Sequence, residues 1–285
     1  MGREPDPWVS RKLLGRRLRR ERERLGRTQQ EVVAALEWSL SKLQRIEAGT
    51  HGVSTTDLRS LLAHYGTGAE QESYLAEARA GREKSWYAAF RDVLSTQVTR
   101  LFGYESIATS IRQVNPLHIP GPLQTRAYAR EQLTPYFAEP RLGQAIEARV
   151  ERQRRLWGTD RPEAAMVIDE SAIRRLVGGP EVMREQLQRL VQAATEPHMS
   201  VRVVPFSAGW HYGLEGSFIL IDVADPQGRT ETVLYQEQAD RDFFTDDDAE
   251  VLTAYDAKWD ALEAVALGER ESGELIADQL RLLEP

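Results

Sequence analysis

Residues 13–65 contain a closely spaced series of helix signals that limits the fold of this chain more than any other feature. Thr28 followed three residues later by Glu31 forms a capping box, which marks the start of a helix. Ser39 is the N-cap candidate of the next helix, and Gly49 is a favourable residue to end it. Because only a few residues separate these two helices, they are expected to cross at an angle. The stretch therefore predicts four short helices with the spacing of a helix-turn-helix.

The helix expected after Ser39 has an apolar face for a small core and a polar face left outside. The expected core residues are Val32, Val33, Leu36, Leu43 and Ile46. The residues left outside are Leu40, Ser41, Lys42, Gln44 and Arg45. A helix that offers Ser, Lys, Gln and Arg in its first turns suits entry into the major groove of DNA. The simpler alternative is an amphipathic helical bundle whose charges are only solvated.

Residues 13–66 resemble the Xre/Cro/repressor type of helix-turn-helix domain over their whole length. The resemblance rests on Leu25-Gly-Arg-Thr-Gln-Gln-Glu31 and on Ser39-Leu-Ser-Lys-Leu-Gln-Arg-Ile-Glu-Ala-Gly49. It implies a partly buried ion pair between Arg22 and Glu47. One position departs from the family pattern, because Glu37 stands in the turn where Gly is usual. We therefore expect a non-glycine residue with positive φ and slight strain there.

The same resemblance implies roles for the residues expected at the DNA. Gln29 would hold a phosphate at the start of its helix, while Ser41 and Arg45 would face base edges. Lys42 and Gln44 would contact phosphate or flanking bases, and Leu40 could touch a thymine methyl group. The predicted DNA-binding residues are Thr28, Gln29, Leu40, Ser41, Lys42, Gln44 and Arg45.

The charge of the chain is unevenly distributed. The formal net charge is −7, yet residues 11–65 contain 12 Lys/Arg against 6 Asp/Glu. We expect Arg17 to pair with Glu21 four residues later on the first helix. Another face of that helix is expected to stay basic, since Glu21 and Glu23 do not neutralise Arg16, Arg20 and Arg24. A basic head on an acidic body would confine the attraction to DNA to the head.

Length and composition limit the remaining possibilities. A chain of 285 residues is long enough for a second and larger core, and we expect a DNA-binding domain with a hinge helix at 1–82 and a second domain at 83–285. Cys is absent, which excludes disulfides and thiolate chemistry. No apolar run approaches the length of a membrane span, and the N-terminal residues do not resemble a signal peptide. We expect a cytoplasmic protein without membrane contact.

The second domain has an α/β pattern. Strands are expected at 108–114, 164–168, 201–204, 217–222 and 232–235, the last two joined as a hairpin through Asp225-Pro-Gln-Gly228. Helices are expected at 86–102, 123–133, 141–157, 181–194, 243–267 and 275–283. The predicted fold is a mainly α helix-turn-helix domain followed by a larger α/β (α+β) domain with a small mixed sheet.

This second domain also resembles a known family. The resemblance covers about residues 100–280 and rests on residues 116–125 (PLHIPGPLQT), 177–183 (VGGPEVM) and 204–209 (VPFSAG), followed by His211 and Gly213. They are similar to the domain of unknown function that follows an Xre-type head in many actinobacterial regulators of the WhiJ kind. Such regulators are commonly encoded beside a small partner protein, in an arrangement likened to toxin–antitoxin pairs. The resemblance implies a protein partner or a signal-sensing role.

No motif in the sequence indicates catalysis. The five His residues lack metal-ligand spacing, and no phosphate-binding glycine loop, nucleophile elbow or Walker motif occurs. Asp246, Asp247 and Asp248 are explained by helix capping. We therefore expect no enzyme, no catalytic residue, no bound metal and no cofactor.

Two loops, 116–125 and 205–213, are the best candidates for an effector or partner site. The residues expected there are His118, Phe206, Trp210, His211 and Tyr212. For the aromatic residues the alternative is a loop that merely seals the core. A deep apolar pocket would favour a small-molecule effector, whereas a flat apolar patch would favour a protein partner. The competing class is an enzyme fused to a DNA-binding head, using the 205–213 loop.

Binding to double-stranded DNA also predicts the oligomeric state. A single head of this size contacts too little DNA for the usual specific affinity. Two half-sites about one helical turn apart, bound by a homodimer, are the common solution. We expect the second domain to supply the dimer surface.

Overall fold

The computed structural model describes residues 6–67, 70–224, 228, 230–237 and 242–283. The described chain forms two compact units that meet in sequence between Ala88 and Ala89. We call residues 6–88 the head and residues 89–283 the body. The head is helical and the body is an α/β unit built on a six-stranded mixed sheet, as predicted.

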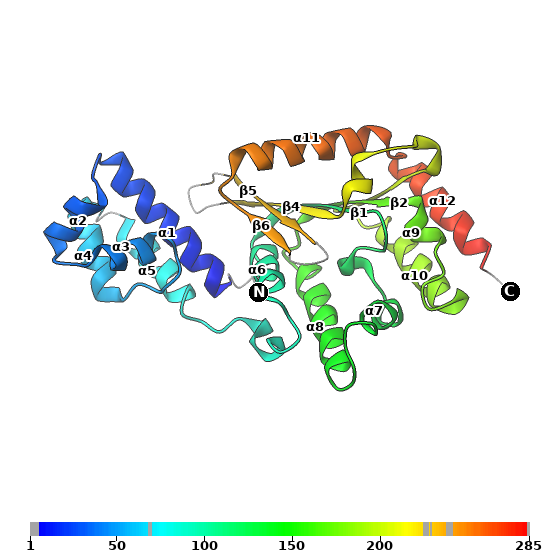
Figure 1. Cartoon of the computed structure of the whole chain (residues 1–285), viewed down its shortest axis with the longest axis horizontal. Coiled ribbons are helices and arrows are strands. Elements are labelled where there is room, and N and C mark those ends of the chain that lie inside the picture. Colours follow the sequence, from blue (N-terminus) through cyan, green and yellow to red (C-terminus); the bar gives the residue numbers. More distant parts are fainter. Residues whose placement is uncertain (1–5, 68–69, 225–227, 229, 238–241, 284–285) are drawn as a thin grey trace. The chain divides into compact units, whose positions relative to one another are not determined.

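The head follows the predicted series of helices (Figure 1). The first helix is longer than expected and begins at Pro7, because the carboxylate of Asp6 accepts hydrogen bonds from the amides of Trp8 and Val9 at 2.8 and 3.1 Å. A further helix follows Gly66, which ends α4 in the left-handed conformation. The helices are α1 (Pro7–Arg24), α2 (Gln29–Leu36), α3 (Leu40–Glu47), α4 (Thr55–Tyr65) and α5 (Gln71–Ala80).

The predicted helix ends around α2 and α3 are confirmed. The Thr28 side chain and Glu31 form a reciprocal capping box, with the amide of Thr28 2.7 Å from the Glu31 carboxylate. Ser39 caps α3 through the amide of Lys42. Gly49 has a φ of 64° and ends α3, and Glu37 adopts the left-handed conformation with a φ of 55°. The turn between the helices therefore has the predicted geometry despite its non-glycine residue.

A glycine sets the distance between α1 and α3. A Cβ atom at Gly15 would lie 2.6 Å from the carbonyl oxygen of Ile46 and 2.7 Å from that of Glu47. Real Cβ atoms do not approach backbone oxygens so closely, so any side chain here would push the two helices apart. The apolar core of the head lies around this contact and includes Leu18, Val32, Leu43, Leu58, Leu61 and Leu62.

Gly15→Ala is accordingly expected to lower the free energy of unfolding of the head by about 1–3 kcal/mol, a typical cost of overpacking. Hydrogen exchange of the α1 and α3 amides in the full chain measures this loss. Gly52→Ala is a matched control, because the nearest atom to its added Cβ is the Arg11 Cδ at 3.8 Å. Equal protection in the two variants would contradict the close packing of α1 on α3.

The body is built around a sheet of strand order β3-β2-β1-β4-β5-β6. β1, β2 and β3 are parallel, whereas β4 pairs antiparallel with β1 and continues into an antiparallel series with β5 and β6. The connections from β1 to β2 and from β2 to β3 are parallel crossovers, and the strands that follow are antiparallel, so the sheet is mixed. The strands are β1 (Ala108–Asn115), β2 (Glu163–Asp169), β3 (Met199–Val204), β4 (Phe218–Ala224), β5 (Thr230–Gln236) and β6 (Phe243–Thr245).

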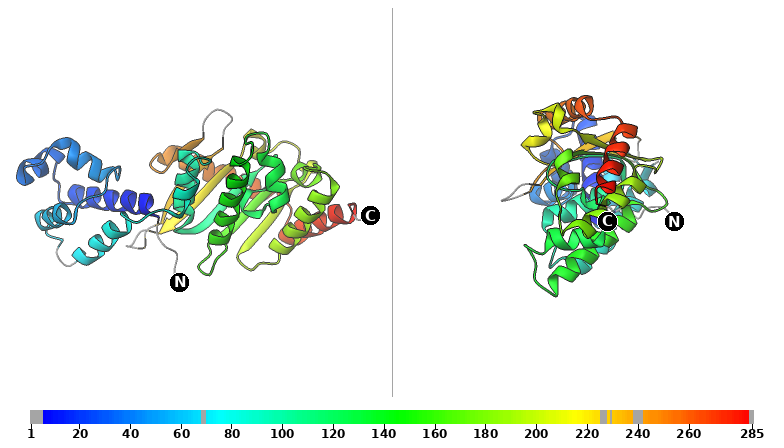
Figure 2. Two further views of the ribbon diagram at one scale, coloured as in Figure 1. Left: turned by 90° about the horizontal axis from the view of Figure 1, so that it is seen from below. Right: turned by 90° about the vertical axis from the view of Figure 1, so that its right-hand side faces the viewer.

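Helices cover both faces of this sheet (Figure 1). α11 packs on one face through Trp259 and Leu262, and α6, α7, α8 and α10 lie on the other. Figure 2 shows this second face, with α7 and α8 in front of the strands. The helices are α6 (Thr96–Glu105), α7 (Arg126–Leu133), α8 (Arg141–Leu156), α9 (Glu170–Arg174), α10 (Pro180–Ala193), α11 (Ala249–Val265) and α12 (Glu269–Arg281).

The structure corrects several expected elements of the body. The helix expected at 86–102 is divided into a short 3-10 helix, η2 (Trp86–Phe90), and α6, because Ser95 caps a new helix through the amide of Val98. The helix expected from 243 begins only at Ala249, since residues 243–245 pair with β5 as β6. The last helix begins at Glu269, six residues before the prediction. Of the predicted hairpin turn, residues 225–227 lie outside the described residues.

Candidate nucleic-acid interface and effector loops

α3 presents a polar face to solvent and buries its opposite face in the head. Ser41, Gln44 and Arg45 are exposed, whereas Leu43, Ile46 and Glu47 are buried. The Arg45 Nε donates a hydrogen bond to the carbonyl oxygen of Ser41 at 3.2 Å. Within the described residues the two terminal nitrogens of Arg45 have no hydrogen-bond acceptor. These groups are therefore free to donate to a base edge, and guanine O6 and N7 are the usual acceptors for arginine.

Two predicted contact residues are less open than expected. Leu40 is half-buried. Lys42 is half-buried too, since its Nζ lies 2.6 Å from the carboxylate of Asp57 and 4.0 Å from the ring centroid of Trp38. The ion pair with Lys42, together with a side-chain hydrogen bond from Ser54 to the carboxylate, lowers the pKa of Asp57 in spite of its partial burial. A phosphate contact by Lys42 would have to compete with this carboxylate.

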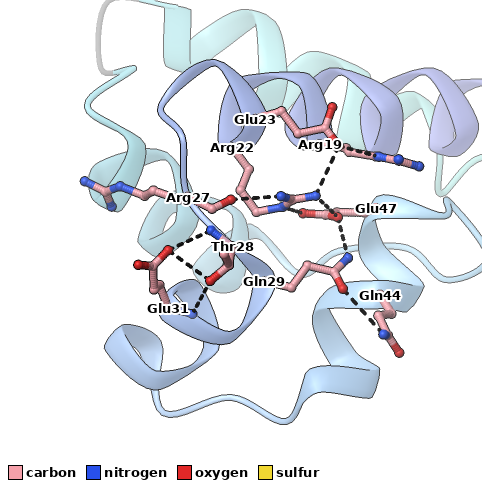
Figure 3. Close-up of polar contacts among 9 residues, drawn as sticks. All are labelled: Arg19, Arg22, Glu23, Arg27, Thr28, Gln29, Glu31, Gln44 and Glu47. Carbon is pink, nitrogen blue, oxygen red and sulfur yellow. Dashed lines mark hydrogen bonds and ion pairs between the residues drawn. The ribbon is translucent and has the colours of Figure 1, made fainter.

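A buried ion pair anchors α3 to α1, as the family resemblance implied (Figure 3). The Arg22 Nε lies 2.6 Å from one Glu47 oxygen, and Nη2 lies 3.0 Å from the other. Arg22 and Glu47 are both buried. The hydrogen bond and charge of Glu47 raise the pKa of Arg22 against the effect of burial. This bidentate geometry fixes the orientation of α3.

The same carboxylate orients the polar side chains that face outward. Gln29 Nε2 donates to Glu47 at 2.8 Å, and Gln44 Nε2 approaches Gln29 Oε1 at 3.4 Å (Figure 3). Thr28 is exposed and its hydroxyl takes part in the capping box. Of the predicted DNA contacts, Gln29 and Gln44 thus lie on one connected hydrogen-bond network that begins at the buried ion pair.

The first helix distributes its charges differently from the prediction. Arg17 does not pair with Glu21: it is buried, forms ion pairs with Glu70 and Glu77, and stacks on Tyr74 at 3.6 Å. Glu21 instead pairs with Arg24 at 2.9 Å, so the face expected to stay basic is partly neutralised. The reason is tertiary packing, because α5 brings acidic residues against α1 from more than fifty positions away.

In the body, loops that follow three parallel strands are joined at the carboxyl ends of those strands. Asp169 ends β2, caps α9 through the amide of Ser171 at 2.8 Å, and lies 3.2 Å from His211 Nε2. The neighbouring Glu170 accepts a hydrogen bond from the amide of Phe206 at 2.7 Å. These acidic residues position the 205–213 loop, although the sequence analysis had assigned them no role.

The predicted effector residues fall into two groups. Phe206, Trp210 and Tyr212 are exposed, with 58%, 65% and 37% of their surface accessible, so they do not seal the core. His211 is buried and serves to hold the loop through Asp169. His118 makes its contacts elsewhere, with Asn115 at 3.4 Å and with Glu237 at 3.9 Å. The structure therefore brings Trp210 and Tyr212 together, whereas Phe206 lies near Arg174. In the described part of the chain none of the three contacts His118.

Residues 98–278 match the family model described as Domain of unknown function (DUF5753). The chain belongs to the DUF5753 family. Ahead of the DUF5753 domain, residues 13–75 match a model described as Helix-turn-helix domain. No curated protein and no solved structure matches the chain.

The described residues contain neither a metal-binding cluster nor a membrane-spanning helix. Among the described residues, no cluster of three or more His, Asp or Glu side chains could hold a metal ion. In the same part of the chain, no helix combines the length and the apolar character needed to cross a membrane.

Proposed function

We propose that this protein is a sequence-specific transcriptional regulator that inserts α3 into the major groove of double-stranded DNA. The observation that carries this proposal is the outward face of α3, where Ser41, Gln44 and Arg45 are exposed while Glu47 fixes the helix from behind. In this role Arg45 and Ser41 read base edges, and Leu40 touches a thymine methyl group. Thr28, Gln29, Lys42 and Gln44 lie near phosphates or flanking bases.

Selection of bound duplexes from a random pool tests this proposal, because it requires no knowledge of the operator. The full chain is expected to enrich a defined sequence, and added salt is expected to weaken binding as counterions are released. Enrichment of no sequence at any salt concentration would contradict sequence-specific recognition. The basic character of residues 11–65 in an acidic chain supports the expected attraction to DNA.

For the body we propose a sensing role in which a partner alters DNA occupancy. The exposed aromatic residues at 206–212 favour a small protein over a small molecule for this loop, because clustered exposed aromatics are typical of protein interfaces. The WhiJ-like resemblance agrees with a small partner encoded nearby, in an antitoxin-like arrangement. We propose no enzymatic activity: His211 is buried and lies against Asp169, which gives it a role in holding the 205–213 loop.

Trp210→Ala tests the loop directly. Trp210 packs edge-on against Tyr212 with 5.1 Å between ring centroids and keeps 65% of its surface exposed, so its truncation removes interface area without opening the core. We expect at least a tenfold loss of affinity for the small protein encoded next to this chain, with an unchanged melting temperature. Tyr136→Ala is the control, since Tyr136 is 78% exposed on another part of the body. Equal affinity of both variants would exclude the loop as the partner site.

We also propose a cytoplasmic homodimer that binds two half-sites about one helical turn apart. A single α3 of eight residues reads too few base pairs for the specific affinities of regulators. Light scattering is expected to give twice the mass of one chain, and footprinting is expected to show two protected half-sites. A monomer that protects one half-site at saturation would contradict this arrangement.

A further inference from the structure

A buried polar cluster lies between α8 and the sheet, outside the aromatic loop. Gln113 and Asn115 of β1 point toward α8. They lie on the same face of the sheet as Met166 and Ile168, the residues of β2 with which they pair. Both polar side chains are buried, with 5% and 2% of their surface exposed. Arg149 of α8 reaches the loop that carries His118, because its Nη1 donates to Gln124 Oε1 and Gln124 Nε2 donates at 2.7 Å to the carbonyl oxygen of Ile119. His118 in turn contacts Asn115. We call Gln113, Asn115, His118 and Arg149 the Arg149 cluster.

Arg149 has no carboxylate partner among the described residues. Its Nη1 donates to Gln124 Oε1 and, at 2.6 Å, to Gln132 Oε1, which are neutral acceptors. Within the described residues, the Nη2 and Nε atoms of Arg149 have no acceptor. The edge of the guanidinium that binds oxyanions in a bidentate manner is therefore open. The contrast with Arg152 on the next turn of α8 is direct, since Arg152 forms a two-point ion pair with Glu105.

The electrostatic surroundings also favour an added negative charge. Burial, followed by the charge of Arg152, lowers the pKa of Arg149 to about 10, which still leaves it cationic at neutral pH. Arg149 is half-buried, and a partly desolvated cation without a counter-ion is costly, so a bound anion would offset that cost. Glu237 is the nearest acid to His118, but its side chain is 59% exposed and lies 3.9 Å from the imidazole.

A second, independent feature is an unused acceptor in the cluster. Gln113 Nε2 donates to Asn115 Oδ1 at 2.6 Å, whereas Gln113 Oε1 is buried and has no hydrogen-bond partner. Buried acceptors are nearly always satisfied, and an unsatisfied one indicates a missing donor. A ligand with a hydroxyl, amine or amide N–H group beside its anionic group would supply that donor.

We propose that the Arg149 cluster binds a small anion of the carboxylate or phosphate class, with the oxyanion held by Arg149 and a donor group of the ligand facing Gln113. The position agrees with the general placement of ligands in α/β proteins, at the carboxyl ends of parallel strands, because β1 ends at Asn115. The regulatory meaning of this site rests on the proposed function: the anion is an effector that changes DNA affinity.

Calorimetric titration of the full chain with inorganic phosphate and with acetate, at constant ionic strength in chloride, tests the site without DNA. At least one of the two anions is expected to bind saturably, and Arg149→Gln is expected to weaken that binding at least tenfold. Arg154→Gln is the matched control on the same helix, since Arg154 is 73% exposed and paired with Glu151, and it should change the affinity by less than twofold. Absence of saturable binding of either anion, or wild-type affinity in Arg149→Gln, would overturn the site.

Glu237→Gln gives a second readout should Arg149→Gln fold poorly. Removal of this exposed acid is expected to tighten anion binding severalfold, and an unchanged or weaker affinity would count against the site. DNA titration then tests the effector role: saturating anion is expected to change the affinity for the selected duplex at least fivefold. An intact anion site with no effect on DNA would overturn that role alone, whereas absence of specific DNA binding both with and without the anion would contradict the proposed function instead.

Discussion

Glu47→Ala is expected to lower the free energy of unfolding of the head by about 3–5 kcal/mol, the typical cost of breaking a buried ion pair by removing one partner. The reason is the position of Arg22, which would remain buried beside the small core of the head without its bidentate carboxylate. Glu23 offers little compensation, because its carboxylate is 3.5 Å from Arg22 and about half exposed. Gln29 would also lose its acceptor.

Hydrogen exchange of the α2 and α3 amides in the full chain measures this loss locally. Glu72→Ala is the control, since Glu72 is 80% exposed and such surface changes are usually within about 0.5 kcal/mol. The double variant Arg22→Met, Glu47→Leu should recover most of the stability, because it leaves no unpaired charge. Equal protection in Glu47→Ala and Glu72→Ala would show that the ion pair does not hold α3 in place.

Local signals explain why the head could be predicted from the sequence. The capping box at Thr28, the cap at Ser39 and the stop at Gly49 each act within a few residues, and each is present in the structure. The positive φ of Glu37 was predictable from the family resemblance, because Glu37 stands in the turn where that family usually has Gly. The close approach of α1 and α3 at Gly15 was not predictable from the sequence, since it depends on how the two helices meet in space.

Longer-range contacts explain the errors. Arg17 has a suitable partner four residues away, yet α5 supplies Glu70 and Glu77 and a ring to stack on. Apolar spacing alone suggested one helix across residues 86–102, whereas the cap at Ser95 divides it. A tertiary contact or a competing cap thus outweighed the local pattern in each case.

The body shows the same limit for functional residues. The aromatic residues at 206–212 were recognisable because large apolar side chains in a glycine-flanked loop are unusual. The sequence did not make Arg149, Gln113 and Asn115 recognisable as site residues, since the alternation along β1 would place polar residues toward water. Only the folded structure shows that Gln113 and Asn115 are buried on the face of the sheet that α8 covers, and that Arg149 of this helix has no carboxylate partner among the described residues.

Arg45→Ala carries the second large expected effect, a loss of about 1–3 kcal/mol on the selected DNA sequence. Arg45 is exposed on α3, and its terminal nitrogens have no acceptor in the described part of the chain, so no internal contact competes with a base. Truncation therefore removes base contacts without disturbing the ion pair of Arg22 with Glu47. Lys42 offers a contrast, because Asp57 already binds its ammonium group and its substitution should cost less.

The most direct test of base recognition is an anisotropy titration of wild type and Arg45→Ala against the selected duplex and a random duplex of equal length. Arg59→Ala is the control, since Arg59 is an exposed arginine on α4 of the same head. We expect Arg45→Ala to lose about 5- to 150-fold in affinity for the selected duplex and much less for the random one. An equal loss on both duplexes would show that Arg45 contacts only phosphate, and would contradict sequence reading by α3.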